Sequence, residues 1–202
     1  MDESVDTSAT VGDRNAPDAV TGAISDAQND VVLDDVVLDD VVLDVDRVRQ
    51  WAYRCVDGLT DRCDEINELN VFPIADSDTG TNLVFTVRAA VESMRGAGPE
   101  ADLTTVTAAL AHGAVSGARG NSGVIASQLM RALAEAAADR TVLSGTDVRG
   151  ALHRAAQLAA DVVSVPVEGT IVTVLESSAA AVAALEPNEG VVAVVRRAVE
   201  AA

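Results

Sequence analysis

Apolar residues recur every three or four positions along most of the chain after residue 45, the spacing that places them on one face of an α-helix. The first stripe extends over residues 48–69 and predicts one long helix. Breaks that contain glycine or proline separate the stripes, so the pattern predicts an all-α fold of seven to eight helices. Later stripes are Leu83/Val84/Val87/Val91/Met94, Leu103/Val106/Leu110, Val124/Ile125/Leu129/Leu133/Ala136, Val148/Leu152/Ala155/Val162, Ile171/Val174/Ser178/Leu185 and Val192/Val195/Val199.

Residues 1–44 follow a different pattern. They are rich in Asp, Ser, Thr and Gly, and the pentapeptide Val-Val-Leu-Asp-Asp at 31–35 recurs at 36–40 and, shortened, at 41–44. A period of five gathers the valines on neither a helix face nor a strand face. We expect a disordered acidic leader over residues 1–44 and a single domain over 45–202, with a short strand or a partner-binding peptide as the alternative for the repeat.

The charge balance limits the partners that the chain can bind. Its 32 acidic residues outnumber its 14 basic residues and give a formal net charge of -18. Such a surface repels nucleic acid and anionic membranes, so we expect neither as a partner. Every basic residue is arginine, which excludes a Walker-type lysine as a phosphate ligand. Aromatic residues make up only 2% of the chain, so the core must be built from small aliphatic side chains on closely packed helices.

Neither the cysteines nor the histidines form a recognisable site. Cys55 and Cys63 lie eight positions apart in a helical pattern, about 12 Å and too far for a disulfide, so we expect free thiols. His112 and His153 lie on helices away from every glycine-rich loop, and we expect no ligand role for them. The acidic N-terminus and the lack of a long apolar run predict a cytoplasmic protein without a membrane span.

The densest polar cluster lies between the first two predicted helices, over residues 70–82. Asp76 and Asp78 are spaced so that their carboxylates can converge on one hard cation such as Mg²⁺. The residues after them begin a helix, where unpaired N–H groups favour an anion. The alternative is that Asp78 or Thr79 only caps this helix. The residues predicted to contact phosphate are Thr79, Gly80, Thr81 and Asn82.

Two further segments precede helices. Residues 117–123 (Gly-Ala-Arg-Gly-Asn-Ser-Gly) contain three glycines that permit close approach of a ligand, and Arg119 could pair with a phosphate. An interhelical turn is the alternative. Residues 166–171 (Pro-Val-Glu-Gly-Thr-Ile), taken alone, are only a helix start.

Together and in this order, the three segments resemble the nucleotide-binding domain of bacterial fatty acid kinases, which is related to the L-subunit of dihydroxyacetone kinases. The matching stretches are Leu-Asn-Val-Phe-Pro from residue 69 with Asp-x-Asp-Thr-Gly-Thr-Asn from 76, Gly-Ala-Arg-Gly-Asn-Ser-Gly-Val-Ile from 117 and Pro-Val-Glu-Gly-Thr from 166. The resemblance covers about residues 46–202. It implies a DhaL-like, barrel-like bundle of antiparallel helices that holds ATP at one end through two Mg²⁺ ions.

The resemblance also assigns roles. It implies that Asp76 and Asp78 bind magnesium and serve catalysis, with Asn70 as a further possible ligand, and that residues 79–82 contact phosphate. The implied activity is a kinase that transfers phosphate to a fatty acid carboxylate presented by a carrier protein, and a homodimer is a further expectation. A carboxylate acceptor needs no general base, so alignment and metal charge would suffice. The residues implied to cover the nucleotide are Gly117, Arg119, Gly120, Asn121, Ser122, Gly123 and Thr170.

Three differences from the family pattern leave alternatives open. Ala75 replaces a proline, and Ser77 replaces a glycine, so a positive φ at Ser77 would cost about 1 kcal/mol. The family pattern continues past Ala202 into a closing glycine-rich segment and a last helix, which we expect this chain to lack. The alternatives to fatty acid kinase activity are a non-catalytic nucleotide- or partner-binding module and a dihydroxyacetone kinase activity.

Overall fold

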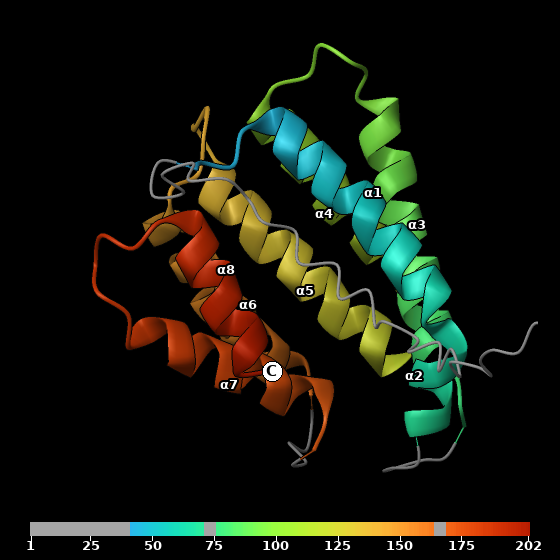
Figure 1. Cartoon of the computed structure of the whole chain (residues 1–202). Coiled ribbons are helices and arrows are strands. Elements are labelled where there is room, and N and C mark those ends of the chain that lie inside the picture. The colour runs from blue at the N-terminus through green and yellow to red at the C-terminus, as the bar shows by residue number, and fades with distance from the viewer. Residues whose placement is uncertain (1–40, 71–75, 164–168) are drawn as a thin grey trace, which may run out of the picture. The chain divides into compact units, whose positions relative to one another are not determined.

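The structure, a computed structural model, describes residues 41–70, 76–163 and 169–202. Within these ranges it contains eight α-helices and no strand, which confirms the all-α prediction (Figure 1). None of these helices is both long and apolar enough to cross a membrane. The helices are α1 (Val45–Asp61), α2 (Cys63–Leu69), α3 (Thr79–Gly96), α4 (Leu103–Ser116), α5 (Gly120–Ala137), α6 (Gly145–Val162), α7 (Ile171–Ala183) and α8 (Val191–Glu200).

The single long helix predicted over residues 48–69 is wrong, because the chain breaks at Arg62. This residue has φ -108° and ψ 11°, outside helical values, and separates α1 from α2. The break sets α2 against the start of α3, where Asn67 hydrogen bonds to Thr81. Sequence periodicity misses it because Ile66 and Leu69 continue the apolar spacing across the break.

The last partial copy of the repeat, residues 41–44, belongs to the same compact unit as the helices. Leu43 exchanges two backbone hydrogen bonds with Leu143, at 2.9 and 2.8 Å, in an isolated antiparallel bridge. The Asp44 carboxylate accepts a hydrogen bond from the N–H of Arg47 at 2.9 Å and so caps α1. The sequence-predicted leader therefore includes residues that fix the start of the first helix. Residues 1–40 lie outside the described ranges.

Consecutive helices from α3 to α8 pack against each other through short connections, as antiparallel neighbours do. α5 lies between the helices α3 and α4 on one side and α6 and α7 on the other (Figure 1). In such an up-and-down arrangement, alternate helices begin at the same end. The N-termini of α3, α5 and α7 therefore meet at one end of the bundle, the lower end in Figure 1.

The core is built from small and aliphatic side chains, as the composition predicts. Met94, Leu103 and Leu110 are fully buried, in agreement with the stripes predicted for α3 and α4. Gly113 of α4 packs directly on the backbone of α3 at Ala89 and Ala90, which brings the two helices close together. Close approach of backbones lets small residues fill the interior without aromatic side chains.

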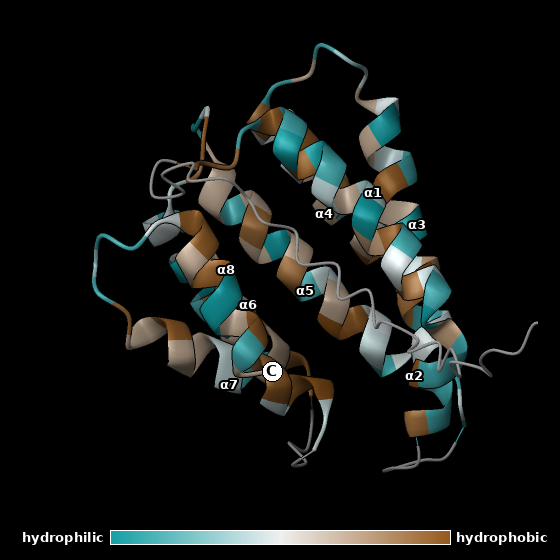
Figure 2. Cartoon of the chain, viewed as in Figure 1, coloured by the Kyte–Doolittle hydropathy of each residue, from teal (hydrophilic) through white to brown (hydrophobic). Residues whose placement is uncertain are grey.

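The buried faces of the last two helices differ from the predicted stripes. α8 buries Val191, Val194 and Ala198, whereas Val195 and Val199 of the predicted stripe are 44% and 70% exposed. In the view of Figure 2, α8 presents both apolar and polar residues. Both valine sets have helical spacing, so periodicity alone does not identify the buried one. The same ambiguity in α7 leaves Val174 exposed while Val172, Ala179 and Val182 are buried.

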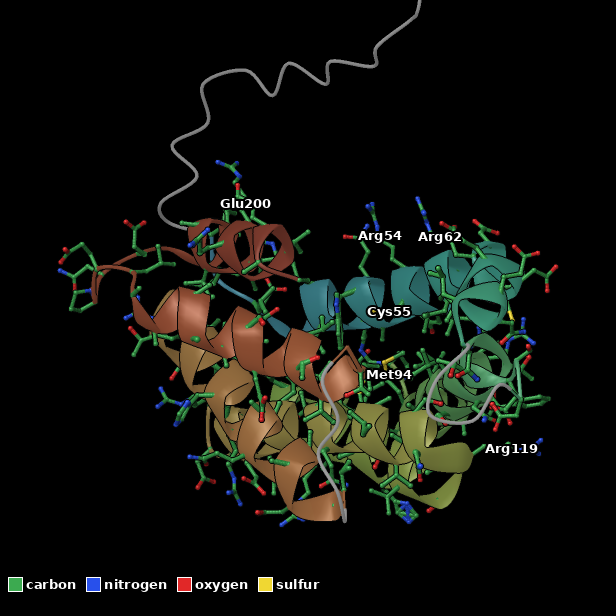
Figure 3. The ribbon with its side chains drawn as sticks, turned by 90° about the horizontal axis from the view of Figure 1, so that it is seen from below. Arg54, Cys55, Arg62, Met94, Arg119 and Glu200 are labelled. Atoms are coloured by element: carbon green, nitrogen blue, oxygen red, sulfur yellow. The ribbon has the colours of Figure 1, made fainter. Side chains whose placement is uncertain are left out.

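Both cysteines are free thiols, as predicted. Figure 3 shows Cys55 and Met94 on the inner side of their helices, whereas Arg54 and Arg62 point outward. Burial raises the pKa of the Cys55 thiol to about 11, so this residue stays protonated near neutral pH and acts as a packing group.

Gly113→Ala tests the close packing of α3 on α4. The added methyl group would collide with the α3 backbone, so we expect the free energy of unfolding to fall by about 2 kcal/mol or more in urea denaturation followed by circular dichroism. Gly150→Ala on α6 is the matched control, since a methyl group there meets nothing within 4 Å. We expect it to raise stability by about 0.5–1 kcal/mol, and equal losses at both positions would contradict the packing argument.

Candidate functional site

A cavity of about 350 Å³ lies where the N-termini of α3, α5 and α7 meet. It brings together residues from all three segments that the sequence singled out, although these segments are 35 or more residues apart. The lining residues that belong to these segments are Asn70, Asp76, Asp78, Thr79, Asn82, Gly120, Asn121, Ser122, Gly169, Thr170 and Ile171.

The two candidate metal ligands lie in the turn before α3. Asp76 is exposed and Asp78 is half-buried, and Ser77 between them has a φ of 51°, the positive value considered from the sequence. The Asn70 side-chain nitrogen donates a hydrogen bond to one Asp76 carboxylate oxygen at 2.6 Å. This bond orients Asp76 and leaves its second oxygen and the Asn70 carbonyl oxygen available to a cation. Ala75 lies outside the described residues.

Asp78 occupies the N-cap position of α3, but its carboxylate makes no capping hydrogen bond in the part of the chain that the structure describes. The alternative that Asp78 is present to cap the helix through its side chain is therefore wrong. Its carboxylate instead lines the cavity. An acidic group at this position is favoured by the positive end of the helix dipole, and it is free to bind a cation.

The four residues predicted to contact phosphate lie in two different environments. Thr79 and Asn82 line the cavity, whereas Gly80 and Thr81 contact α2. Gly80 packs so closely on the Cys63 carbonyl that a side chain there would clash with it. The N–H groups of Thr79 and Gly80 have no hydrogen-bond partner among the described residues, as expected for the first turn of a helix.

In the second segment, residues 117–123, only some of the residues line the cavity. Gly120, Asn121 and Ser122 line the cavity at the start of α5, and their backbone N–H groups have no partner within the described ranges. Gly120 has a φ of 57°, and a side chain there would lie 2.5 Å from the Asn82 side-chain nitrogen. Glycine is therefore required both by the backbone and by the contact between the first and second segments.

The other predicted members of this segment have packing positions. A methyl group at Gly117 would clash with Ala89 and one at Gly123 with Thr86, so both glycines let helices approach α3. The Arg119 guanidinium lies over the Phe85 ring, 4.0 Å from its centroid, and is absent from the cavity lining. Figure 3 shows Arg119 projecting outward from the bundle.

Two polar side chains in the cavity wall have little exposed surface. Asn82 and Ser122 are 9% and 8% exposed, and neither side chain forms a hydrogen bond with another described residue. Neither has a fully buried polar atom without a partner, since Arg149 Nε is the one such atom among the described residues. The polar groups of Asn82 and Ser122 therefore add to the polar part of the cavity wall.

The third segment contributes the start of α7. Thr170 is its N-cap residue, and the Thr170 N–H donates to Thr173 Oγ1 at 3.1 Å. Gly169 before it has a φ of 76° and lines the cavity. Residues 164–168, which include Pro166 and Glu168 of the motif, lie outside the described residues.

The sequence predicts no site role for the apolar residues of the cavity wall. Three of them, Leu69, Ile125 and Ile171, lie within the motif stretches, and the others lie in or beside the helical stripes. They become site residues because the bundle brings the end of α2, the first turns of α5 and α7 and the end of α6 together. They are Ile66, Leu69, Ile125, Val163, Ile171 and Val172.

The residues present fit a magnesium ion bound together with a phosphate ligand. No group of three or more His, Cys, Asp or Glu side chains that could hold a metal occurs in the described ranges. Asp76 and Asp78 supply two carboxylates, and Mg²⁺ typically takes one or two carboxylates and completes its coordination with water and phosphate oxygens. His112 and His153 are exposed and outside the lining.

A second cavity of about 350 Å³ lies between α5 and α6 and contains none of the motif residues. Its charged side chains neutralise one another, with Arg140 paired to Asp147 at 3.1 Å and Arg154 to Glu135 at 2.8 Å. The hydrogen bond from Arg154 lowers the pKa of Glu135, which stays ionised in this pair. The candidate site is therefore the cavity at the helix N-termini.

The DAK2 domain family matches residues 73–202. The chain belongs to this family. DAK2 domains are part of the dihydroxyacetone kinase family, so the chain is a kinase-family nucleotide-binding module, which confirms the resemblance inferred from the motifs.

The relatives of this DAK2 domain chain are longer proteins. Protein YloV of Bacillus subtilis (strain 168) is 36% identical over 121 residues, which cover 60% of this chain and 22% of YloV. An uncharacterized protein of Staphylococcus epidermidis (strain ATCC 12228) is 33% identical over 123 residues, covering 61% and 22%. An uncharacterized protein of Staphylococcus haemolyticus (strain JCSC1435) is 32% identical over 123 residues, which again cover 61% of this chain and 22% of the relative. The matched region thus spans less than a quarter of each relative's length.

Ser77→Gly tests the strain in the turn that carries Asp76 and Asp78. Because glycine adopts a positive φ without steric cost, we expect this variant to raise the free energy of unfolding by about 1 kcal/mol in urea denaturation. Gly169→Ala is the converse control, since its φ is also positive and a methyl group meets nothing nearby. It should lose about 1 kcal/mol, and a loss at Ser77→Gly would show that the serine makes a compensating interaction.

Proposed function

We propose that the cavity binds Mg-ATP and that the chain transfers the γ-phosphoryl group to a small acceptor, most favourably a fatty acid carboxylate. The observation that supports this proposal is the meeting of three helix N-termini with two carboxylates in one cavity. Helix N-termini favour phosphate, whereas carboxylates repel it unless a cation lies between them. A ligand that combines phosphate with a divalent cation satisfies both sets of groups.

In this proposal Asp76 and Asp78 hold magnesium, with Asn70 either orienting Asp76 or adding its carbonyl oxygen. Magnesium, when bound, would neutralise charge that develops on the phosphate oxygens. Two carboxylates present enough oxygens to share between two ions, so the expectation of two magnesium ions remains part of the proposal.

The phosphates would be bound by backbone N–H groups rather than by cationic side chains. Thr79 and Gly80 of α3 and residues 120–122 of α5 present N–H groups that have no partner among the described residues. Asn82 and Ser122 present buried side-chain groups to the same cavity. These donors are fixed by the helices that carry them, so their alignment requires little rearrangement on binding.

The apolar part of the lining favours an acceptor with a hydrocarbon portion. Leu69 is 74% exposed at the end of α2, and Ile66, Ile125 and Val163 contribute further apolar surface beside the carboxylates. A carboxylate oxygen of the acceptor would form a bond to the γ-phosphorus as the bond to ADP breaks, giving an acyl phosphate and ADP. The acceptor is already ionised near neutral pH, so the absence of histidine from this lining is compatible with the reaction.

A fatty acid presented by a separate carrier protein fits this acceptor, because an insoluble chain requires a protein to deliver it. A hydroxy-ketone such as dihydroxyacetone is the less favoured acceptor, since it would use none of the apolar lining. The acceptor, the carrier protein, a cytoplasmic location and a homodimer are all parts of this proposal.

A second candidate is a module that binds Mg-ATP without turnover. One observation favours it: no arginine, lysine or histidine lines the cavity among the described residues, and Arg119 stacks on Phe85 instead. Kinases commonly stabilise the transferred phosphoryl group with a cationic side chain in addition to magnesium.

Asp76→Asn and Asp78→Asn test the proposed metal site. We expect each to weaken Mg-ATP binding by about 100-fold or more in isothermal titration calorimetry, since loss of even a hydrogen-bond partner of a metal ligand typically costs 10–100-fold. Asp57→Asn on the exposed surface of α1 is the matched control with the same charge change, and its affinity should equal that of the unaltered chain. Unchanged affinity in both site variants would contradict the proposal.

Turnover separates the two candidates. ATP consumption that requires fatty acid and a carrier, with formation of acyl phosphate, supports the kinase, whereas Mg-ATP binding without consumption supports the module. Formation of a sugar phosphate from dihydroxyacetone would replace the proposed acceptor.

A further inference from the structure

One side chain of helix α2 that the proposed function does not use forms two hydrogen bonds with the start of α3. α2 has no buried residue of its own. Its Asn67 accepts a hydrogen bond from the Thr81 N–H with Oδ1 at 3.2 Å and donates one from Nδ2 to Thr81 Oγ1 at 3.0 Å. The amide thus binds both the backbone and the side chain of a single residue in the first turn of α3.

This pair of bonds determines which N–H groups in the first turn of α3 remain without a described partner. The N–H groups of Thr79, Gly80 and Thr81 in the first turn have no partner inside α3. Asn67 occupies that of Thr81, which leaves those of Thr79 and Gly80 without a described partner. Without a partner, the Thr81 N–H could form a hydrogen bond with a phosphate if the first turn of α3 rotated. The bond to Asn67 opposes that rotation.

Packing reinforces the same restraint. Gly80 lies against the Cys63 carbonyl at the start of α2, and Cys63 Sγ lies 3.8 Å from Thr81 Oγ1. The other end of α2 supplies Ile66 and Leu69 to the cavity wall. Asn67 therefore couples the apolar wall of the cavity to the turn that would bind phosphate.

We propose that Asn67 is a positioning residue that fixes the first turn of α3 for phosphate binding through its two hydrogen bonds to Thr81. Asn67 does not line the cavity and touches no ligand in this account. The inference rests on the proposed function, because it concerns the affinity of the same cavity for Mg-ATP.

Calorimetry of Mg-ATP binding to the full chain tests the inference. Asn67→Ala should weaken binding about tenfold, since both bonds to Thr81 are lost. Thr81→Val should weaken it about threefold, because it loses the hydroxyl contacts with Asn67 and Cys63 Sγ but keeps the N–H bond to Asn67, and Thr81→Ser, which keeps the hydroxyl, should restore the original affinity. Asn67→Ala combined with Thr81→Val should bind no more weakly than Asn67→Ala alone. Asp64→Asn, on the exposed surface of α2, is the matched control and should leave affinity unchanged.

All variants are compared at a temperature at which circular dichroism shows them fully folded, so that unfolding does not contribute. Should Asn67→Ala fail to fold, the Thr81→Val and Thr81→Ser pair tests the same bond. Equal affinity of the folded Asn67→Ala and unaltered chains, or equal affinity of the Thr81→Val and Thr81→Ser variants, would overturn the inference. Absence of Mg-ATP binding by the unaltered chain would instead overturn the proposed function, and the inference with it.

Discussion

The shared direction of α3, α5 and α7 is the constraint on which the site depends. Because the helices from α3 onward alternate in direction, their odd-numbered members begin at one end and point three positive dipole ends at one cavity. Each terminus also presents backbone N–H groups that a helix cannot satisfy internally. Asp76 and Asp78 line the cavity at this same end of the bundle.

The proposed function requires a chain with a net charge of -18 and no lysine to bind a phosphate ligand. In this proposal the attraction comes neither from the protein surface as a whole nor from cationic side chains in the described lining. It comes from backbone N–H groups held at fixed positions by close helix packing. That packing depends on small residues, such as Gly113 between α3 and α4 and Gly123 against Thr86.

The fold class and the motif residues that line the cavity could be predicted from the sequence, because helical spacing and three rare segments carry that information locally. The break at Arg62 could not, since it depends on the contact of α2 with α3 rather than on any local signal. The buried face of α8 was ambiguous because two valine stripes have the same spacing. Arg119 has the chemistry of a phosphate ligand, but only the structure shows its guanidinium over Phe85.

Amide NMR spectra of the ¹⁵N-labelled chain would show whether the helix N-termini and the two carboxylates bind Mg-ATP together. Titration with ATP in the presence of Mg²⁺ should shift the amide signals of Thr79, Gly80 and residues 120–122, and titration with ATP in the presence of EDTA should leave them in place. Shifts confined to residues around Arg140 and Arg154, or shifts at the helix N-termini that are independent of magnesium, would contradict the account.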